Sequence, residues 1–145
     1  MAEVTYVEAI RSAMEEEMRR DDRVLLMGED VGAKGGVFGA TAGLFQEFGE
    51  ERVIDSPLAE AAIVGVAIGC ALAGLRPVAE IQFLDFIPPA MDQIISEAAK
   101  IRYRSNNDWN CPMVIRSRGG RVSRNGSWKK RANSRAKIRR PWRVS

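Results

Sequence analysis

The chain has 145 residues, enough for one domain with a sizeable core, and 46% of them are hydrophobic. It contains no histidine, which excludes histidine-based catalytic triads, histidine zinc sites and histidine proton shuttles within this chain. The net charge of +3 combines two unlike parts: residues 1–115 hold all 19 Asp and Glu but 10 of the 22 Lys and Arg, a charge of −9, whereas residues 116–145 carry +12. Fold and function must therefore be argued from the first part.

The first part begins with the pattern of a helix, a strand and a glycine-rich loop. Thr5 and Glu8 form a capping box, and apolar residues at helical spacing predict a helix over residues 6–20. The apolar run 24–27 predicts a strand that is buried on both faces. A long mobile loop with four glycines is expected next, as a plain loop rather than a phosphate cradle, and then a short helix over residues 41–48.

The alternation of strands and helices continues to residue 116. A second strand is predicted at 52–55, and Ser56 and Pro57 are expected to cap and open a helix that ends at Ala73. A third strand at 77–83, a long helix over 89–103 and a fourth strand at 113–116 complete the pattern. This order predicts an α/β fold with a parallel sheet that helices cover on both faces.

The apolar periodicity ends after Arg118. Residues 1–117 are therefore predicted to form a partial domain, and residues 118–145 a basic, disordered tail. Trp128 and Trp142 make nucleic-acid binding an alternative function of the tail, but an aberrant tail is the preferred interpretation. Since the sequence shows no signal peptide, no membrane span and no cysteine framework, we expect a cytoplasmic protein without membrane contact.

Three polar or aromatic residues are expected at the carboxyl edge of the sheet, where ligands of such folds bind. Glu60 falls in the first turn of the helix after the second strand, Gln82 near the end of the third strand, and Phe86 a few residues beyond. A carboxylate, an amide and an aromatic ring suit a flat nitrogen heterocycle. The plainer alternatives are a dipole-favoured helix residue, a solvated strand end and a core side chain. Small neighbours of Glu60, with Gly65 and Gly69, favour tight packing of this helix against a partner element.

Several strings of residues resemble one known family. They include Gly28-Glu29-Asp30-Val31-Gly32, Gly35-Gly36-Val37-Phe38, Asp55-Ser56-Pro57-Leu58-Ala59-Glu60, Gly74-Leu75-Arg76-Pro77 and Glu97-Ala98-Ala99-Lys100. Over residues 4–117 the sequence is similar to beta subunits of thiamine-diphosphate-dependent 2-oxo acid dehydrogenases. The stretches Ile81–Pro89 and Lys100–Ser105 are most similar to the branched-chain (2-oxoisovalerate) type.

The resemblance implies an incomplete transketolase-like pyrimidine-binding domain and roles for particular residues. Glu60 matches the catalytic glutamate that hydrogen-bonds the aminopyrimidine ring of thiamine diphosphate. Leu58, Gln82 and Phe86 match positions that line the same ring. The backbone carbonyls of Pro112, Val114 and Ile115 match, more weakly, a site for a monovalent cation.

The resemblance also implies partners and leaves the substrate open. An alpha subunit that supplies the magnesium and diphosphate sites, a second beta subunit and a lipoyl-bearing acyltransferase are expected. A pyruvate or acetoin dehydrogenase is the alternative to the branched-chain enzyme. The family continues into a loop with a histidine and a second domain, whereas this chain changes to a basic string at residues 116–120. A change of reading frame there would explain the tail, and the chain alone is expected to be inactive.

Overall fold

The computed structural model describes residues 4–119. In this range, a four-stranded parallel sheet has the order β2-β1-β3-β4. The strands are β1 (Val24–Gly28), β2 (Val53–Asp55), β3 (Arg76–Ile81) and β4 (Val114–Ser117). The predicted α/β class and the parallel sheet are therefore confirmed. The expectation of a disordered tail lies outside the described residues, apart from residues 118 and 119.

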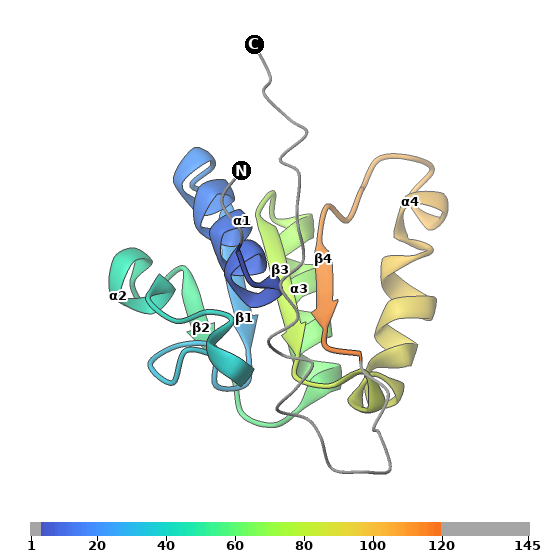
Figure 1. Ribbon diagram of the computed structural model, residues 1–145. Coiled ribbons are helices and arrows are strands. Elements are labelled where there is room, and N and C mark those ends of the chain that lie inside the picture. The colour runs from blue at the N-terminus through green and yellow to red at the C-terminus, as the bar shows by residue number, and fades with distance from the viewer. Residues whose placement is uncertain (1–3, 120–145) are drawn as a thin grey trace.

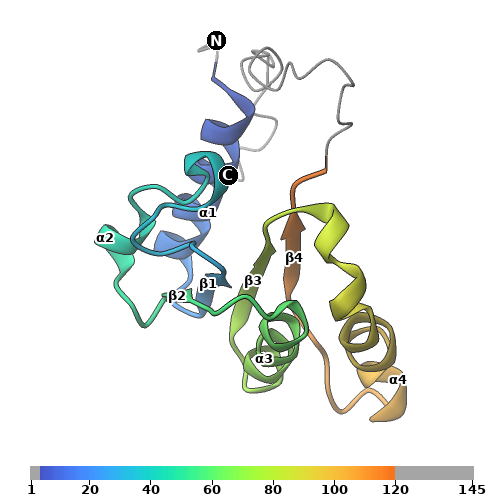
Figure 2. The ribbon, with the colours of Figure 1, turned by 90° about the horizontal axis from the view of Figure 1, so that it is seen from below.

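Helices lie on both faces of the sheet (Figures 1 and 2). On one face, α1 (Tyr6–Arg20) and α2 (Leu44–Phe48) pack on β1 and β2 through a buried cluster that includes Met18, Leu26 and Val53. On the other face, α3 (Glu60–Leu72) packs on β1 and β3, with Ala67 and Ala79 fully buried. All five residues of β1 are buried, as the uninterrupted apolar run predicts for a central parallel strand.

The capping box at the start of α1 has the predicted geometry. The backbone N–H of Thr5 donates to Glu8 Oε2 at 2.7 Å, and the backbone N–H of Glu8 donates to Thr5 Oγ1 at 3.2 Å. These two bonds satisfy amide groups that the helix itself leaves without partners.

Replacing Thr5 with alanine is expected to lower the free energy of unfolding by about 1 kcal/mol, because the hydroxyl acceptor at the cap is lost. Chemical denaturation of the parent and variant chains measures the difference. Thr5→Ser, which keeps the hydroxyl, serves as the control and should stay within about 0.5 kcal/mol of the parent. Equal losses in both variants would contradict the capping role.

Three predicted helices, over residues 41–48, 58–73 and 89–103, differ from those in the structure. Helix α2 begins at Leu44. Helix α3 begins at Glu60 with Ala59 as its cap, and the Ser56 hydroxyl donates to the Pro57 carbonyl instead of capping the helix. Residues 84–104 form no single helix: they comprise two short 3₁₀ turns, a π-helical segment over Gln93–Ala98 and the short helix α4 (Ile101–Arg104). Within residues 4–119, no helix combines the length and the apolar character that crossing a bilayer requires.

Candidate active site at the carboxyl edge of the sheet

The carboxyl ends of the four strands lie at one edge of the sheet because all strands are parallel. Gly28, Asp55, Ile81 and Ser117 are the last strand residues at this edge. Helix α3 begins at the same edge, and the segment after β3 leaves from it (Figure 1). The topology therefore brings the segments of Glu60, Gln82 and Phe86 to one edge, as the sequence predicts.

Glu60 is the first residue of α3 and is half-buried. Its cap residue, Ala59, has an extended backbone (φ −161°) and contributes no side-chain hydrogen bond to the helix. Among residues 4–119, no hydrogen bond or ion pair occupies the Glu60 carboxylate. A carboxylate at this position is favoured by the helix dipole and remains able to accept a hydrogen bond from a ligand.

Two apolar side chains are exposed near this edge. Leu58 is 70% exposed in the segment between β2 and α3, and Phe86 is 45% exposed in the 3₁₀ turn after β3. The Phe86 ring packs edge-to-face on Phe83, with centroids 5.7 Å apart. Phe86 is therefore not a core residue, and one of its faces can meet a planar ligand.

Gln82 follows β3 directly and is half-buried. Its Nε2 donates to the backbone carbonyl of Glu29 at 3.4 Å, which is a long hydrogen bond. The structure thus gives Gln82 a contact with the loop that follows β1. The carbonyl of its amide remains available for a ligand.

The glycine-rich loop after β1 contains contacts that sequence reasoning missed. Asp55 Oδ1 accepts the backbone N–H of Gly32 at 2.8 Å. Phe38 has a left-handed backbone (φ 61°), and the Arg118 guanidinium lies over its ring at 3.8 Å from the centroid. No short sequence motif predicts these contacts, because each joins residues that are far apart in the sequence.

A buried ion pair joins β3 and β4 and was also missed. Glu80 is 3% exposed and pairs with Arg116, its register partner on the next strand. Burial raises the pKa of the Glu80 carboxyl, and the Arg116 guanidinium acts in the opposite direction. An acidic residue within an apolar strand and a basic residue in the following strand are the only sequence signals of this pair.

The three residues of the expected cation site lie elsewhere. Pro112 precedes β4, and Val114 and Ile115 are its first two residues. All three therefore lie at the amino end of β4, opposite the carboxyl edge of the sheet. Their neighbour Cys111 is half-buried, and burial raises the pKa of its thiol. Residues 4–119 contain no cluster of three or more His, Cys, Asp or Glu side chains that could hold a metal ion.

The two glycines of α3 have different surroundings within the described residues. A Cβ at Gly65 would lie 3.3 Å from Gln93 Oε1, so this glycine accommodates a side chain of the π-helical segment. A Cβ at Gly69 would meet no atom within 4 Å among the described residues. Close packing is therefore present at Gly65, whereas Gly69 faces open space in this part of the chain.

Comparisons with known proteins identify relatives of this chain. Residues 2–127 match the family described as "Transketolase, pyrimidine binding domain". The chain is 68% identical over 117 residues to the 2-oxoisovalerate dehydrogenase subunit beta of Bacillus subtilis (strain 168). It is 51% identical over 117 residues to the pyruvate dehydrogenase E1 component subunit beta of the same organism. It is 51% identical over 113 residues to a 2-oxoisovalerate dehydrogenase subunit beta of Pseudomonas aeruginosa.

These matches cover most of this chain but only part of each relative. They span 81% of this chain and 36% of each Bacillus subtilis protein, and 78% of this chain and 32% of the Pseudomonas protein. The chain thus spans about a third of the length of these relatives. The family match extends ten residues past position 117, into residues outside the described range.

Proposed function

Because the chain belongs to the family of the transketolase pyrimidine-binding domain, we propose that it is part of the beta subunit of a thiamine-diphosphate-dependent 2-oxo acid dehydrogenase. The proposed reaction is the oxidative decarboxylation of branched-chain 2-oxo acids, with transfer of the acyl group to lipoyl groups. The observation that carries the proposal is the position of Glu60, a carboxylate without a protein partner in the described range, at the carboxyl edge and at the start of α3.

The residues at this edge fit the aminopyrimidine ring of the proposed cofactor. The Glu60 carboxylate would accept a hydrogen bond from a protonated ring nitrogen, Phe86 and Leu58 would supply apolar surface for the ring, and Gln82 would supply an amide. When bound, the cofactor supplies the nucleophilic carbon of the reaction, and the protein tunes the basicity of the cofactor. Glu60 is the proposed catalytic residue.

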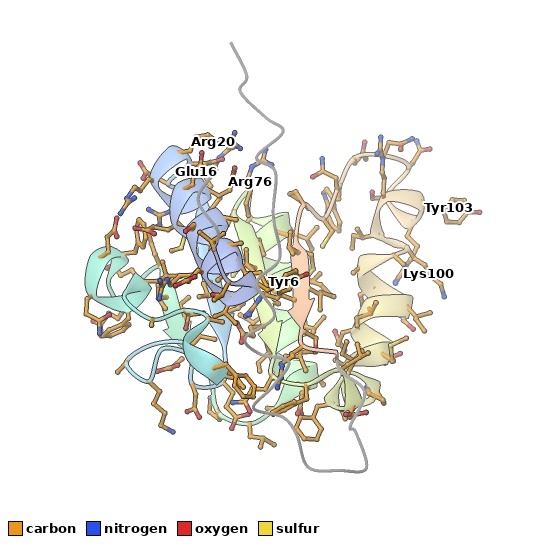
Figure 3. The ribbon with its side chains drawn as sticks, in the orientation of Figure 1. Tyr6, Glu16, Arg20, Arg76, Lys100 and Tyr103 are labelled. Carbon is orange, nitrogen blue, oxygen red and sulfur yellow. The ribbon has the colours of Figure 1, made fainter. Side chains whose placement is uncertain are left out.

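Partner subunits are part of the same proposal. An alpha subunit would provide the magnesium and diphosphate sites, a second beta subunit would complete the assembly, and the acyltransferase would present the lipoyl group. In support, α3 exposes Val66 (54%) and Leu72 (40%), and Tyr103 on α4 is 89% exposed and points away from the body of the chain (Figure 3). Exposed apolar side chains of this size are typical of surfaces that partner chains cover.

Three further assignments remain proposals. The backbone carbonyls of Pro112, Val114 and Ile115 would bind a monovalent cation. A cytoplasmic location is supported by Cys70 and Cys111, both free thiols. The basic residues 118–145 are proposed to be an aberrant tail without nucleic-acid function, and the coding sequence after codon 116, read in all three frames, tests this interpretation.

The substrate test uses an in-frame, full-length beta subunit assembled with its alpha subunit. We expect kcat/KM for 2-oxoisovalerate to exceed that for pyruvate by at least roughly 10–200-fold, the discrimination that a single methylene group allows in an apolar pocket, because the two substrates differ by two carbons. The higher identity to a 2-oxoisovalerate dehydrogenase subunit, 68% against 51%, favours this order. A preference for pyruvate or acetoin would establish the alternative, and the 145-residue chain alone should show no turnover.

A further inference from the structure

The glycine-rich loop over residues 29–40 is a compact unit whose role the proposed reaction leaves open. The backbone N–H of Gly36 donates to the Asp30 carbonyl at 2.8 Å, and the N–H of Thr41 donates to the Gly35 carbonyl at 3.0 Å. The Thr41 hydroxyl is buried and donates to the Val31 carbonyl at 2.7 Å. The loop therefore has an internal shape of its own, and its position on the sheet depends on the contacts that attach it to its neighbours.

Side chains from three strand ends attach this loop to the carboxyl edge. Asp55, at the end of β2, accepts the Gly32 N–H at 2.8 Å. Gln82, after β3, donates to the Glu29 carbonyl at 3.4 Å, and Arg118, after β4, lies over the Phe38 ring. The Asp55 contact is the shorter of the two hydrogen bonds and involves a carboxylate, so it is the stronger one.

The identity of Gly32 is explained by Asp55. A Cβ at Gly32 would lie 2.5 Å from Asp55 Oδ2 and 2.9 Å from Cγ, closer than non-bonded atoms approach. Unlike Gly35 and Gly36, Gly32 has no positive φ, so its backbone conformation does not require glycine. The absence of a side chain at residue 32 is what lets the carboxylate lie against the backbone of the loop.

The same carboxylate belongs to the segment that leads to Glu60. Asp55 is the register partner of Gly28, and the Ser56 N–H donates to the Gly28 carbonyl at 2.9 Å. Four residues separate Asp55 from Glu60, and Pro57 restricts the backbone among them. The connection between Asp55 and the first turn of α3 is therefore short, and Pro57 restrains part of it.

We propose that Asp55 is a positioning residue: its carboxylate fixes the loop 29–40 to the end of β2, from which the segment 56–60 leads to Glu60, so that Glu60 meets the aminopyrimidine ring in one orientation. The inference rests on the proposed function for the identity of the ring. The tether between the loop and β2 does not depend on that identity. The two parts can therefore be tested separately.

The first experiment measures backbone hydrogen exchange on the 145-residue chain. In Asp55→Ala, the amides of Gly32, Gly36 and Thr41 and of the first turn of α3 should exchange on the order of 10–100-fold faster, since a hydrogen bond to a charged group is lost. Asp55→Asn retains an acceptor oxygen and should keep these amides within about threefold of the parent. Glu51→Ala, a change at an exposed residue in the turn before β2, is the matched control and should leave them unchanged.

The second experiment separates positioning from folding in the in-frame subunit assembled with its alpha subunit. Asp55→Ala should raise the Kd for thiamine diphosphate roughly tenfold and lower kcat, and Asp55→Asn should restore both to within about threefold. Unchanged loop exchange in Asp55→Ala overturns the tether. Faster exchange with unchanged Kd and kcat overturns the positioning of Glu60 alone, whereas a parent assembly that binds no thiamine diphosphate overturns the proposed function and the ring orientation with it.

Discussion

Replacing Arg116 with alanine is expected to lower the free energy of unfolding by about 3–5 kcal/mol at neutral pH. The reason is the position of its partner: Glu80 is 3% exposed between β3 and β4, and without Arg116 its carboxylate is buried without a counter-charge. The same pair joins β3 to β4, a strand of four residues at the edge of the described sheet. Chemical denaturation at pH 7 measures the loss.

The pH dependence of this loss follows from the direction of the pKa shift. Burial raises the pKa of Glu80 above its usual value of 4.5, so its protonated form is the one that folding favours. The stabilisation by this group is complete below pH 4.5 and is lost as the pH rises through the folded-state pKa. Removing Arg116 raises that pKa further, so the deficit of the Arg116→Ala chain should be smaller near pH 4.5 than at pH 7.

Two controls distinguish the effect of a buried ion pair from that of an exposed one. Arg104 pairs with Glu97 at 3.1 Å on the surface, and Arg104→Ala should cost less than about 1 kcal/mol at either pH. The double variant Glu80→Leu with Arg116→Met removes both charges and should recover most of the lost stability. Equal losses for the two arginine variants, without pH dependence, would show that Glu80 and Arg116 contribute no more than an exposed pair.

Helices and strands could be predicted where a continuous stretch of sequence carries a regular apolar pattern or a capping motif. The capping box and apolar spacing predicted α1 with its observed bounds, and the run 24–27 lies within the fully buried β1. The alternation of strands and helices was sufficient to predict a parallel sheet, because two parallel strands must be joined by a crossover element such as a helix. The carboxyl-edge position of Glu60 then followed from topology alone.

The segment between β3 and β4 was not predictable in the same way. Its apolar residues have helical spacing, yet the backbone comprises 3₁₀ turns, a π-helical segment and a short α-helix. Ile87 and Ile94 pack against the cluster around Val64 and Ile81, so tertiary packing determines the local winding. The spacing of apolar residues does not distinguish an α-helix from 3₁₀ or π-helical segments that bury the same side chains.

The details of the candidate site depend on contacts between distant residues. Asp55 and Gly32 are 23 positions apart, and Gln82 and Glu29 are 53 apart. Sequence reasoning placed Gln82 at the correct edge but could not supply its bond to the Glu29 carbonyl. The family resemblance supplied residue roles, whereas these tethers required the three-dimensional structure.

Glu60→Gln is expected to slow decarboxylation of the 2-oxo acid by roughly 10²–10⁴-fold in the full-length beta subunit paired with its alpha subunit. Glutamine has the shape of glutamate and still offers an acceptor oxygen, but it cannot take up or hold a proton at the ring. Since Glu60 has no protein partner among residues 4–119, the change removes no internal hydrogen bond of the described fold. The cost in stability should be confined to the lost helix-dipole interaction, about 0.3–1 kcal/mol.

The measurement is turnover at saturating thiamine diphosphate, together with the unfolding midpoint of each variant. Glu51→Gln, the same chemical change at an exposed residue before β2, is the control and should leave both quantities unchanged. If Glu60 is only a dipole-favoured helix residue, its variant will lose a little stability and keep its turnover. Turnover within twofold of the parent would therefore rule out a catalytic Glu60, because no proton-transfer role at the ring survives the loss of the carboxylate.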